Sequence, residues 1–321
     1  MFRRVTGVVF ALVVTAVAAT AAAAPTSGPN GLIAYAQEVR GRYQLFTIRP
    51  DGTENTQVTH LKGTAFGPDW SPDGKLIAFT YETPRANGSV ALISARGTGF
   101  REVTPAAPEP RPKHVWNGNP AFTPDGKSIV FVRNQGPADS GIWIMRTDGS
   151  GLRRLTRNPY VRNWDGGDVA PTVSPDGRRI AFVRIKKAET LQALFVVRTD
   201  GTGLRQVTPY SLEVAIKVDW SSDGRLIVLT TNADWVRPHK SANLVVIRPD
   251  GSGQTQLTRF AGRKQNAFAG SFSPDGKRIV FRLEQGSRYA LAVIDRNGHN
   301  LRLLTRLSEA KPRAIDWGTA R

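Results

Sequence analysis

Three aspartates that each precede a tryptophan are candidates for chemistry. They are Asp69, Asp219 and Asp316, and all three stand at the same place in a repeated unit. Carboxylates that meet at one point could hold a cation, or act as an acid and a base. Other units carry an uncharged residue at this place: Ala121, Thr172 or Ser271. The alternative is structural, with each aspartate accepting hydrogen bonds from the backbone or from a neighbouring unit.

The histidines and cysteines offer no metal site. The histidines are His60, His114, His239 and His299, and no two of them have the spacing of metal ligands. The chain has no cysteine, which excludes disulfides and thiolate ligands. It also lacks the Gly-x-Ser-x-Gly stretch that presents a serine nucleophile in α/β-hydrolases. We therefore expect no metal, no cofactor and no enzymatic activity.

A phrase built on Asp-Gly recurs five times. It reads WSPDGKLIAF from Trp70 and FSPDGKRIVF from Phe272, and its copies recur about every 50 residues. Proline presets the backbone of a turn, aspartate can bond its own backbone, and glycine can adopt a positive φ. The period is far too long for a calcium-binding nonapeptide repeat. We therefore interpret the phrase as a hairpin turn. Its aspartates are Asp73, Asp125, Asp176, Asp223 and Asp275.

Each repeated unit reads as four short strands. A strand that ends in a large apolar residue precedes the Ser-Pro-Asp-Gly turn, and a β-rich run such as Ile77–Phe79 follows it. A third strand then ends at a second Asp-Gly or Asn-Gly turn, and a fourth strand ends in Val-Thr or Leu-Thr. The closing threonines are Thr59, Thr104, Thr156, Thr208, Thr258 and Thr305.

The two ends of the chain complete one unit together. Pro29–Tyr35 reads as a second strand without a first strand before it, whereas Ile315–Trp317 matches the first strand Val218–Trp220. The C-terminal segment therefore supplies the missing strand of the N-terminal unit. The sequence predicts an all-β, six-bladed β-propeller of four-stranded blades, closed by pairing of the C-terminal strand with the N-terminal blade.

The N-terminal residues differ from the repeat. Arg3 and Arg4 precede an apolar run that ends in alanines before Pro25, which is typical of a secretory signal peptide. We expect a signal peptide over residues 1–24 and a propeller over residues 25–321, in a protein exported to the periplasm or the exterior. The alternative is an uncleaved membrane anchor. No later stretch is apolar and long enough to span a membrane.

The chain is strongly basic. Forty-four Lys and Arg residues against 26 Asp and Glu residues give a formal net charge of +18. Such an excess favours anionic partners, among them lipids, acidic polymers and nucleic acid, although a generally basic, soluble surface is the alternative. The export signal and the lack of a basic groove motif argue against nucleic acid.

The run Trp-Ser-Pro-Asp-Gly-Lys-x-Ile-Ala-Phe, followed by a third strand, Asp-Gly and Leu-Thr, resembles the TolB-type β-propeller repeat, a WD-repeat-like unit. The resemblance extends from Pro29 to Trp317. It implies six blades, a location outside the cytoplasm and a protein-binding scaffold role. TolB carries an α/β domain before its propeller, whereas this repeat begins close to the expected cleavage site. The related prolyl oligopeptidase-like enzymes carry a Gly-x-Ser-x-Gly hydrolase motif that is absent here.

The two faces of such a propeller differ in their loops. The hairpin turns form one face, here called the tight-turn face, and we expect these turns to be too short to shape a pocket. Loops between strands two and three, and between successive units, form the opposite, long-loop face, and the longest are Pro105–Asn119, Arg157–Asp168 and Asn232–Ser241. Tryptophans and basic residues on these loops suit peptides, sugars or anionic chains, unless the tryptophans fill gaps over the blades. The candidate binding residues are His114, Trp116, Arg162, Trp164, Trp235, Arg237, His239, Arg263 and Lys264.

The main functional hypothesis is an exported, monomeric, non-catalytic propeller. It would bind a protein or an anionic cell-envelope component through the long-loop face. The alternative is an exported propeller enzyme of the lyase or glycosidase type, with Asp69, Asp219 and Asp316 at the mouth of the central channel.

Overall fold

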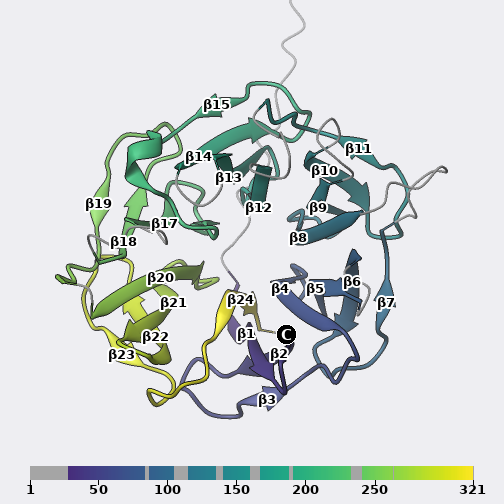
Figure 1. The fold of residues 1–321 in the computed structure, drawn as a ribbon. Helices are drawn as coiled ribbons and strands as arrows, with labels where there is room; N and C mark the ends of the chain where they lie inside the picture. The colour runs from purple at the N-terminus through teal and green to yellow at the C-terminus, as the bar shows by residue number, and fades with distance from the viewer. Residues whose placement is uncertain are drawn as a thin grey trace, which may run out of the picture.

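The computed structural model describes residues 28–83, 87–104, 115–134, 140–159, 167–187, 191–232, 241–262 and 264–320. These residues form 24 β-strands and one short 3-10 helix, Tyr210–Leu212. The strands make four sheets of four strands and one sheet of eight. Figure 1 shows the sheets arranged as blades around a central axis, with β4, β8, β12, β20 and β24 nearest to it. The predicted all-β propeller fold is confirmed.

The strand bounds follow the sequence repeat. One sheet has the order β24-β1-β2-β3, with bounds Arg313–Thr319, Asn30–Val39, Arg42–Ile48 and Thr56–Gln57. The eight-stranded sheet holds β4 to β11, with bounds Thr64–Trp70, Leu76–Glu82, Gly88–Ser94, Arg101–Glu102, Trp116–Phe122, Ser128–Asn134, Gly141–Arg146 and Arg153–Arg154. Strands β12 to β15 are Gly167–Val173, Arg179–Lys187, Leu191–Arg198 and Arg205–Gln206. Strands β16 to β19 are Asp219–Trp220, Ile227–Thr231, Asn243–Ile247 and Thr255–Gln256. Strands β20 to β23 are Gln265–Phe272, Arg278–Gln285, Arg288–Asp295 and Arg302–Leu303.

The eight-stranded sheet consists of two meanders. Strands β4 to β7 pair antiparallel in sequence order, and so do β8 to β11. A single parallel pairing, Gly88 with Trp116, joins the two meanders. Each meander therefore repeats the pattern of the four-stranded sheets.

Both chain ends contribute to the sheet β24-β1-β2-β3, which we call the split sheet. Strand β24 pairs antiparallel with β1, and Ile33 lies opposite Trp317. Figure 1 shows the yellow C-terminal strand beside the purple N-terminal strands. The apolar cluster that contains Ile33 and Trp317 also contains Val280 and Leu291 of β21 and β22. The split sheet therefore packs against the last sheet of the chain.

The Ser-Pro-Asp-Gly turns owe their shape to their own side chains. Ser71 Oγ donates a hydrogen bond to Asp73 Oδ1 at 2.7 Å, and the Lys75 N–H donates to the same oxygen at 3.1 Å. Gly74 follows with a φ of 66°, which glycine adopts without strain. Hydrogen bonding from Ser71 holds the pKa of Asp73 below its usual range. The same two contacts recur at Asp125, Asp176, Asp223 and Asp275, although the turn reads Thr-Pro-Asp-Gly at Asp125 and Ser-Ser-Asp-Gly at Asp223. The structural interpretation of these aspartates is confirmed.

The repeated threonines also have a structural role. Thr59 Oγ1 accepts a hydrogen bond from the Leu45 N–H at 2.8 Å, and so anchors the end of the fourth strand to the third. The other five threonines each accept the backbone N–H of one third-strand residue: Val90, Ile142, Leu194, Leu244 and Leu291.

The core lies between neighbouring sheets. The second strands carry fully buried phenylalanines: Phe79, Phe131, Phe182 and Phe281. Val228 and Leu244 of one sheet pack with Phe272 and Phe281 of the next, which shows how apolar side chains join adjacent sheets. Among the described residues, no helix is long and apolar enough to cross a membrane.

Candidate functional site

The three candidate carboxylates lie on inner strands and bind the backbone of a neighbouring strand. Asp69 on β4 accepts the Phe122 N–H of β8 at 2.7 Å. Asp316 on β24 accepts the Trp70 N–H of β4 at 2.9 Å. Asp219 on β16 likewise accepts an N–H from β20 at 2.8 Å. Each carboxylate therefore ties one inner strand to the next, as the structural alternative predicts.

Two of the three uncharged residues at the corresponding positions are partners of Asp219. Thr172 donates its hydroxyl to Asp219 Oδ1 at 3.2 Å, and Ser271 donates its hydroxyl to Oδ2 at 2.9 Å. The ring of carboxylates is thus incomplete because two of its positions supply hydrogen-bond donors.

Two of the three channel carboxylates, Asp69 and Asp219, have raised pKa values. Burial, and secondly the Asp316 carboxylate, raise the pKa of Asp69 well above its ordinary value. Burial raises the pKa of Asp219 to about 6, against the opposing field of Lys217. Lys217 Nζ lies 3.9 Å from Asp316 Oδ1, so one cation sits among three carboxyl groups. Sequence reasoning missed this lysine because no motif marks the position.

The channel leaves little room for a substrate. A cavity of about 40 Å³ adjoins Lys217, and its walls include Pro68, Pro120 and Pro171. This space suits a water molecule rather than a sugar ring. Within the described residues, no group of three or more His, Asp and Glu side chains is arranged to hold a metal ion.

Most of the candidate residues on the long-loop face lie outside the described residues. These are His114, Arg162, Trp164, Trp235, Arg237, His239 and Arg263. Lys264 is described and lies exposed, immediately before β20.

Trp116 was expected on a loop, and the structure corrects this. It begins β8, where its ring stacks on Phe66 with the ring centres 6.4 Å apart. A Cβ atom added at Gly88 would lie 2.5 Å from the indole, and one at Gly118 would lie 2.6 Å from it. The ring therefore fills the space that two glycines leave between adjacent strands, which is the gap-filling alternative.

The long-loop face carries a hollow. Its volume is about 320 Å³, and Arg42, Lys62 and Glu82 line it together with backbone of the adjoining loops. The walls are mostly polar, with two basic side chains and one acidic one.

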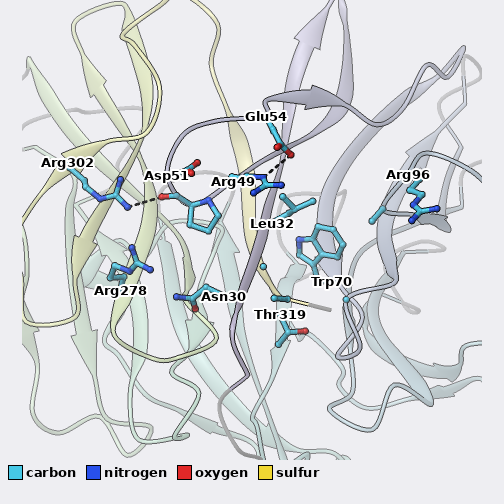
Figure 2. A pocket seen from close by; sticks show the side chains of 15 residues that line it. Asn30, Leu32, Arg49, Asp51, Glu54, Trp70, Arg96, Arg278, Arg302 and Thr319 are labelled. Atoms are coloured by element: carbon cyan, nitrogen blue, oxygen red, sulfur yellow. Dashed lines mark hydrogen bonds and ion pairs between the residues drawn. The ribbon is translucent and has the colours of Figure 1, made fainter.

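The tight-turn face carries a larger hollow, of about 650 Å³. The expectation that this face cannot shape a pocket is therefore wrong. Strands β24 and β1 come from opposite chain ends, so no hairpin turn joins them, and the hollow opens beside their ends. Figure 2 shows Leu32 and Trp70 in the middle of the hollow, Arg278 and Arg302 on one side, and Arg96 on the other.

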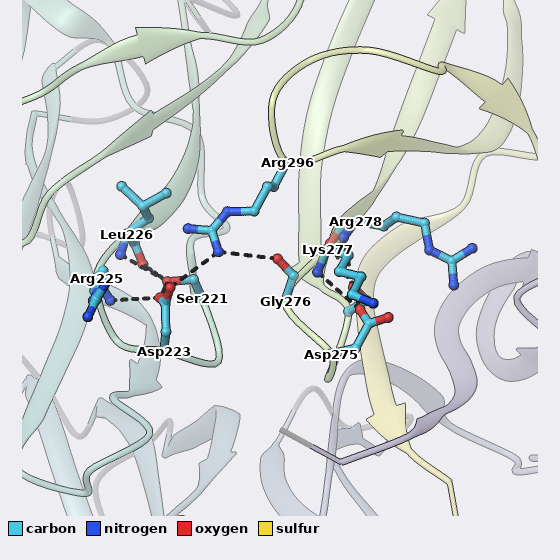
Figure 3. Close-up of polar contacts among 10 residues, drawn as sticks. Ser221, Asp223, Arg225, Leu226, Asp275, Gly276, Lys277, Arg278 and Arg296 are labelled. Atoms are coloured by element: carbon cyan, nitrogen blue, oxygen red, sulfur yellow. Dashed lines mark hydrogen bonds and ion pairs between the residues drawn. The ribbon is translucent and has the colours of Figure 1, made fainter. Parts of the chain in front are cut away.

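Neighbouring turns on this face are tied by polar contacts. Arg296 donates to Asp223 Oδ2 at 3.2 Å and to the Gly276 carbonyl at 3.5 Å, which connects two successive Asp-Gly turns (Figure 3). At the split sheet, Asn30 takes the place of a turn. Its amide donates to Asp275 Oδ2 at 3.0 Å, and its carbonyl accepts the Asp275 N–H at 3.2 Å.

Several known proteins are similar to this chain. A Tol-Pal system protein TolB from Anaeromyxobacter dehalogenans (strain 2CP-C) is 32% identical over 141 residues, which cover 44% of this chain and 29% of the relative. An uncharacterized peptidase, YuxL, from Bacillus subtilis (strain 168) is 28% identical over 199 residues, which cover 51% of this chain and 29% of the relative. This chain therefore spans less than a third of the length of either relative.

The fold has a solved counterpart. The crystal structure of TolB from Acinetobacter baumannii superimposes with a TM-score of 0.71 at 22% identity, covering 90% of this chain and 67% of that chain. The model of one family, the TolB beta propeller domain, matches residues 36–320. Because the match spans nearly all described strands, the chain belongs to the TolB β-propeller family.

Proposed function

We propose that this chain is an exported, non-catalytic scaffold that binds a protein or an anionic cell-envelope component through its long-loop face. The observation that carries the proposal is the set of contacts that the channel carboxylates make. Asp69, Asp219 and Asp316 each accept a backbone N–H from a neighbouring strand, so their first task is to hold the sheets together. Family membership and a relative named as a Tol-Pal system protein support a scaffold role.

The scaffold is a closed ring of six blades in this proposal. The two meanders of the eight-stranded sheet count as two blades, and the four remaining sheets complete the six. The split sheet closes the ring through β24 and β1. Residues 1–24 act as a signal peptide, so the mature chain starts near Pro25. In this proposal the mature chain is a monomer. N-terminal sequencing of the exported protein tests the cleavage, and a chain that retains Arg3 would contradict it.

The long-loop face offers a polar docking surface. The hollow between Arg42 and Lys62 presents two cations and one carboxylate. Exposed Lys264 adds a third cation on the same face. Such a surface favours an anionic partner through charge complementarity.

The test is recovery of partners from envelope fractions by the purified chain. We expect the double variant Arg42→Glu, Lys62→Glu to lose the recovered partner at least tenfold. The matched control is Lys127→Glu, because Lys127 is an exposed lysine on the tight-turn face. Equal recovery by both variants, with unchanged melting curves, would place the partner elsewhere.

An enzymatic function remains the second candidate because two channel carboxyl groups have raised pKa values. A pKa of about 6 at Asp219 suits a general acid or base. The two candidates differ in one experiment. Asp219→Asn would abolish a glycosidase or lyase activity, whereas it leaves partner binding on the long-loop face unchanged.

A further inference from the structure

The hollow on the tight-turn face lies opposite the long-loop face. Its volume of about 650 Å³ falls in the range of ordinary ligand pockets. It extends from the inner strand ends at Gly74 and Thr319 to the outer turns that hold Asp51 and Arg96 (Figure 2). Its form is therefore that of a groove across the split sheet.

The groove exists because the repeat is interrupted there. In the other sheets a Ser-Pro-Asp-Gly turn connects the first and second strands, but β24 and β1 have no such connection. Their register shifts between Asn30 and Ile33, so Gly31 and Leu32 bulge out of the pairing. The Trp317 indole donates to the Gly31 carbonyl at 3.1 Å and holds this bulge in place. Leu32 consequently lines the groove.

The carboxylates of the groove are already paired within their own loop. Glu54 forms an ion pair with Arg49 at 2.8 Å. Asp51 accepts hydrogen bonds from the hydroxyl and the backbone N–H of Thr53, which hold the pKa of Asp51 below its usual range.

Three other arginines line the groove without an ion pair among the described residues. They are Arg96, Arg278 and Arg302. Arg302 donates to the Pro50 carbonyl at 2.8 Å, and Arg278 lies over the Trp317 ring at 5.2 Å. These contacts position the guanidinium groups, and neither contact neutralises their positive charge. Asp275 lies nearby, its pKa lowered chiefly by the hydrogen bond from the Ser273 hydroxyl and to a smaller extent by Arg278, and the groove still keeps a net positive charge.

The centre of the groove is apolar, and a buried indole N–H lies beside it. Leu32 and Trp70 lie between the arginines (Figure 2). Trp70 is 8% exposed, and its indole N–H has no hydrogen-bond partner among the described residues. The corresponding indole of Trp220 donates to the Thr172 carbonyl at 3.2 Å. Within the described part of the chain, Trp70 therefore lacks the acceptor that its counterpart has.

We propose that this groove binds an acidic segment of a partner polypeptide. Carboxylates of the segment pair with Arg96 on one side and with Arg278 and Arg302 on the other, and an apolar side chain covers Leu32 and Trp70. The planar fork of arginine matches a carboxylate in a bidentate pair. Because the cations stand on two sides of an apolar centre, the groove fits alternating acidic and apolar groups better than one compact anion. This site is independent of the long-loop face.

Two fluorescein-labelled peptides of eight residues test the chemistry. One alternates Glu with Leu, and the matched peptide alternates Gln with Leu. We expect the acidic peptide to bind the purified full chain at least tenfold more tightly in fluorescence anisotropy, and to weaken as salt is raised. Equal affinity for the two peptides would overturn the proposal.

Matched arginine variants test whether the acidic peptide binds in the groove. Arg96 and Arg146 are both exposed and lie at outer turns of the eight-stranded sheet, but only Arg96 lines the groove. We expect Arg96→Glu to weaken the acidic peptide at least tenfold and Arg146→Glu to weaken it less than twofold. Equal losses would show a general charge effect and contradict the site. An unchanged affinity in Arg96→Glu, with an unchanged melting curve, would also contradict it.

The indole of Trp70 gives a direct readout. Its ¹⁵N–¹H signal is identified by its loss in Trp70→Phe. We expect the acidic peptide to shift this signal and to leave the Trp220 signal in place. Binding without a shift at Trp70 would locate the peptide elsewhere. If millimolar inorganic phosphate displaces the peptide completely, the groove is a simple anion site and the proposal is wrong.

Discussion

The Asp-Gly turns and the open end of the split sheet occupy corresponding places on one face. They differ in whether their charged side chains are already bound within the protein. In each turn the aspartate is held by a hydroxyl and a backbone N–H of the same turn, as at Asp73. At the split sheet there is no turn, and Asn30 provides the contact to Asp275 instead. A groove opens beside it, lined in part by arginines that form no ion pair with any described residue. The repeat closes the surface, and its interruption creates a place for a ligand.

The largest effect should follow from removing the strand that the split sheet receives from the C-terminus. Deletion of residues 311–321 removes β24, exposes the edge of β1 and leaves the Trp70 N–H without Asp316. We expect a loss of more than about 4 kcal/mol in the free energy of unfolding, measured by urea denaturation. Deletion of Arg321 alone is the control and should change little. If the longer deletion melts like the full chain, β24 contributes little to the stability of the split sheet.

Trp116 lies where the repeat is tightly packed, in contrast to the open end of the split sheet. Alanine at this position leaves the space between Gly88 and Gly118 empty. We expect a loss of about 3–4 kcal/mol in the free energy of unfolding, in the range of aromatic-to-alanine changes. Trp116→Phe should recover a part of it. A folded, fully stable Trp116→Ala variant would show that the ring serves binding rather than packing.

The propeller fold was predictable because its determinants are local and repeated. Turn chemistry at Asp73 and hydrogen bonding at Thr59 can be inferred from residue type alone, and each copy strengthens the inference. The pairing of the chain ends followed from matching Ile315–Trp317 to another inner strand. Trp116 was misplaced because a single sequence does not show where a long loop ends and a strand begins.

The candidate site was predictable only in part. The three Asp-Trp pairs marked the channel, but their partners did not stand out, because Thr172, Ser271 and Lys217 carry no recognisable motif. The groove on the tight-turn face was missed for a physical reason. It comes from a turn that is absent and from arginines far apart in sequence, such as Arg96 and Arg302. The only sequence signal was the place where the repeat fails.

The raised pKa values of Asp219 and Asp69 predict how the free energy of unfolding depends on pH. Their effect is opposite to that of the turn aspartates. Below about pH 4, Asp219 is protonated in the folded and the unfolded chain. Between about pH 4 and pH 6 the unfolded chain releases this proton, while the folded chain, with a pKa of about 6, keeps it. The free energy of unfolding therefore falls as pH rises, by up to about 3 kcal/mol from this group, and is level above pH 6. Asp69 acts in the same direction, with Lys217 and Asp316 as the charges that face both.

Urea denaturation at pH 4, 5, 6 and 7 measures this dependence. Asp219→Asn keeps an acceptor for the Phe272 N–H and removes the titration, so its stability should fall less between pH 4 and pH 6. Identical profiles for the two proteins would contradict the assignment. The turn aspartates, such as Asp125, have lowered pKa values, so their contribution is lost only as pH falls below about 4.

A smaller effect should come from the contacts that shape the tight-turn face. Asp125→Ala removes the acceptor of the Thr123 hydroxyl and of the Lys127 N–H. Asn30→Ala removes the two hydrogen bonds to Asp275. We expect each change to cost about 1–2 kcal/mol in thermal or urea unfolding. A negligible cost for Asn30→Ala, beside a clear cost for Asp125→Ala, would show that Asn30 does not replace a turn.

The smallest effect should come from Arg296, which bridges two turns at the surface. Its ion pair with Asp223 and its hydrogen bond to the Gly276 carbonyl are partly exposed (Figure 3). Water and salt screen such a pair, so Arg296→Gln should cost less than about 1 kcal/mol. The cost should fall further in 0.5 M salt, because screening weakens the pair in the parent chain. The effect is measured by urea denaturation at both salt concentrations. A loss larger than that of Asn30→Ala would mean that ties between turns, rather than the turns themselves, hold this face together.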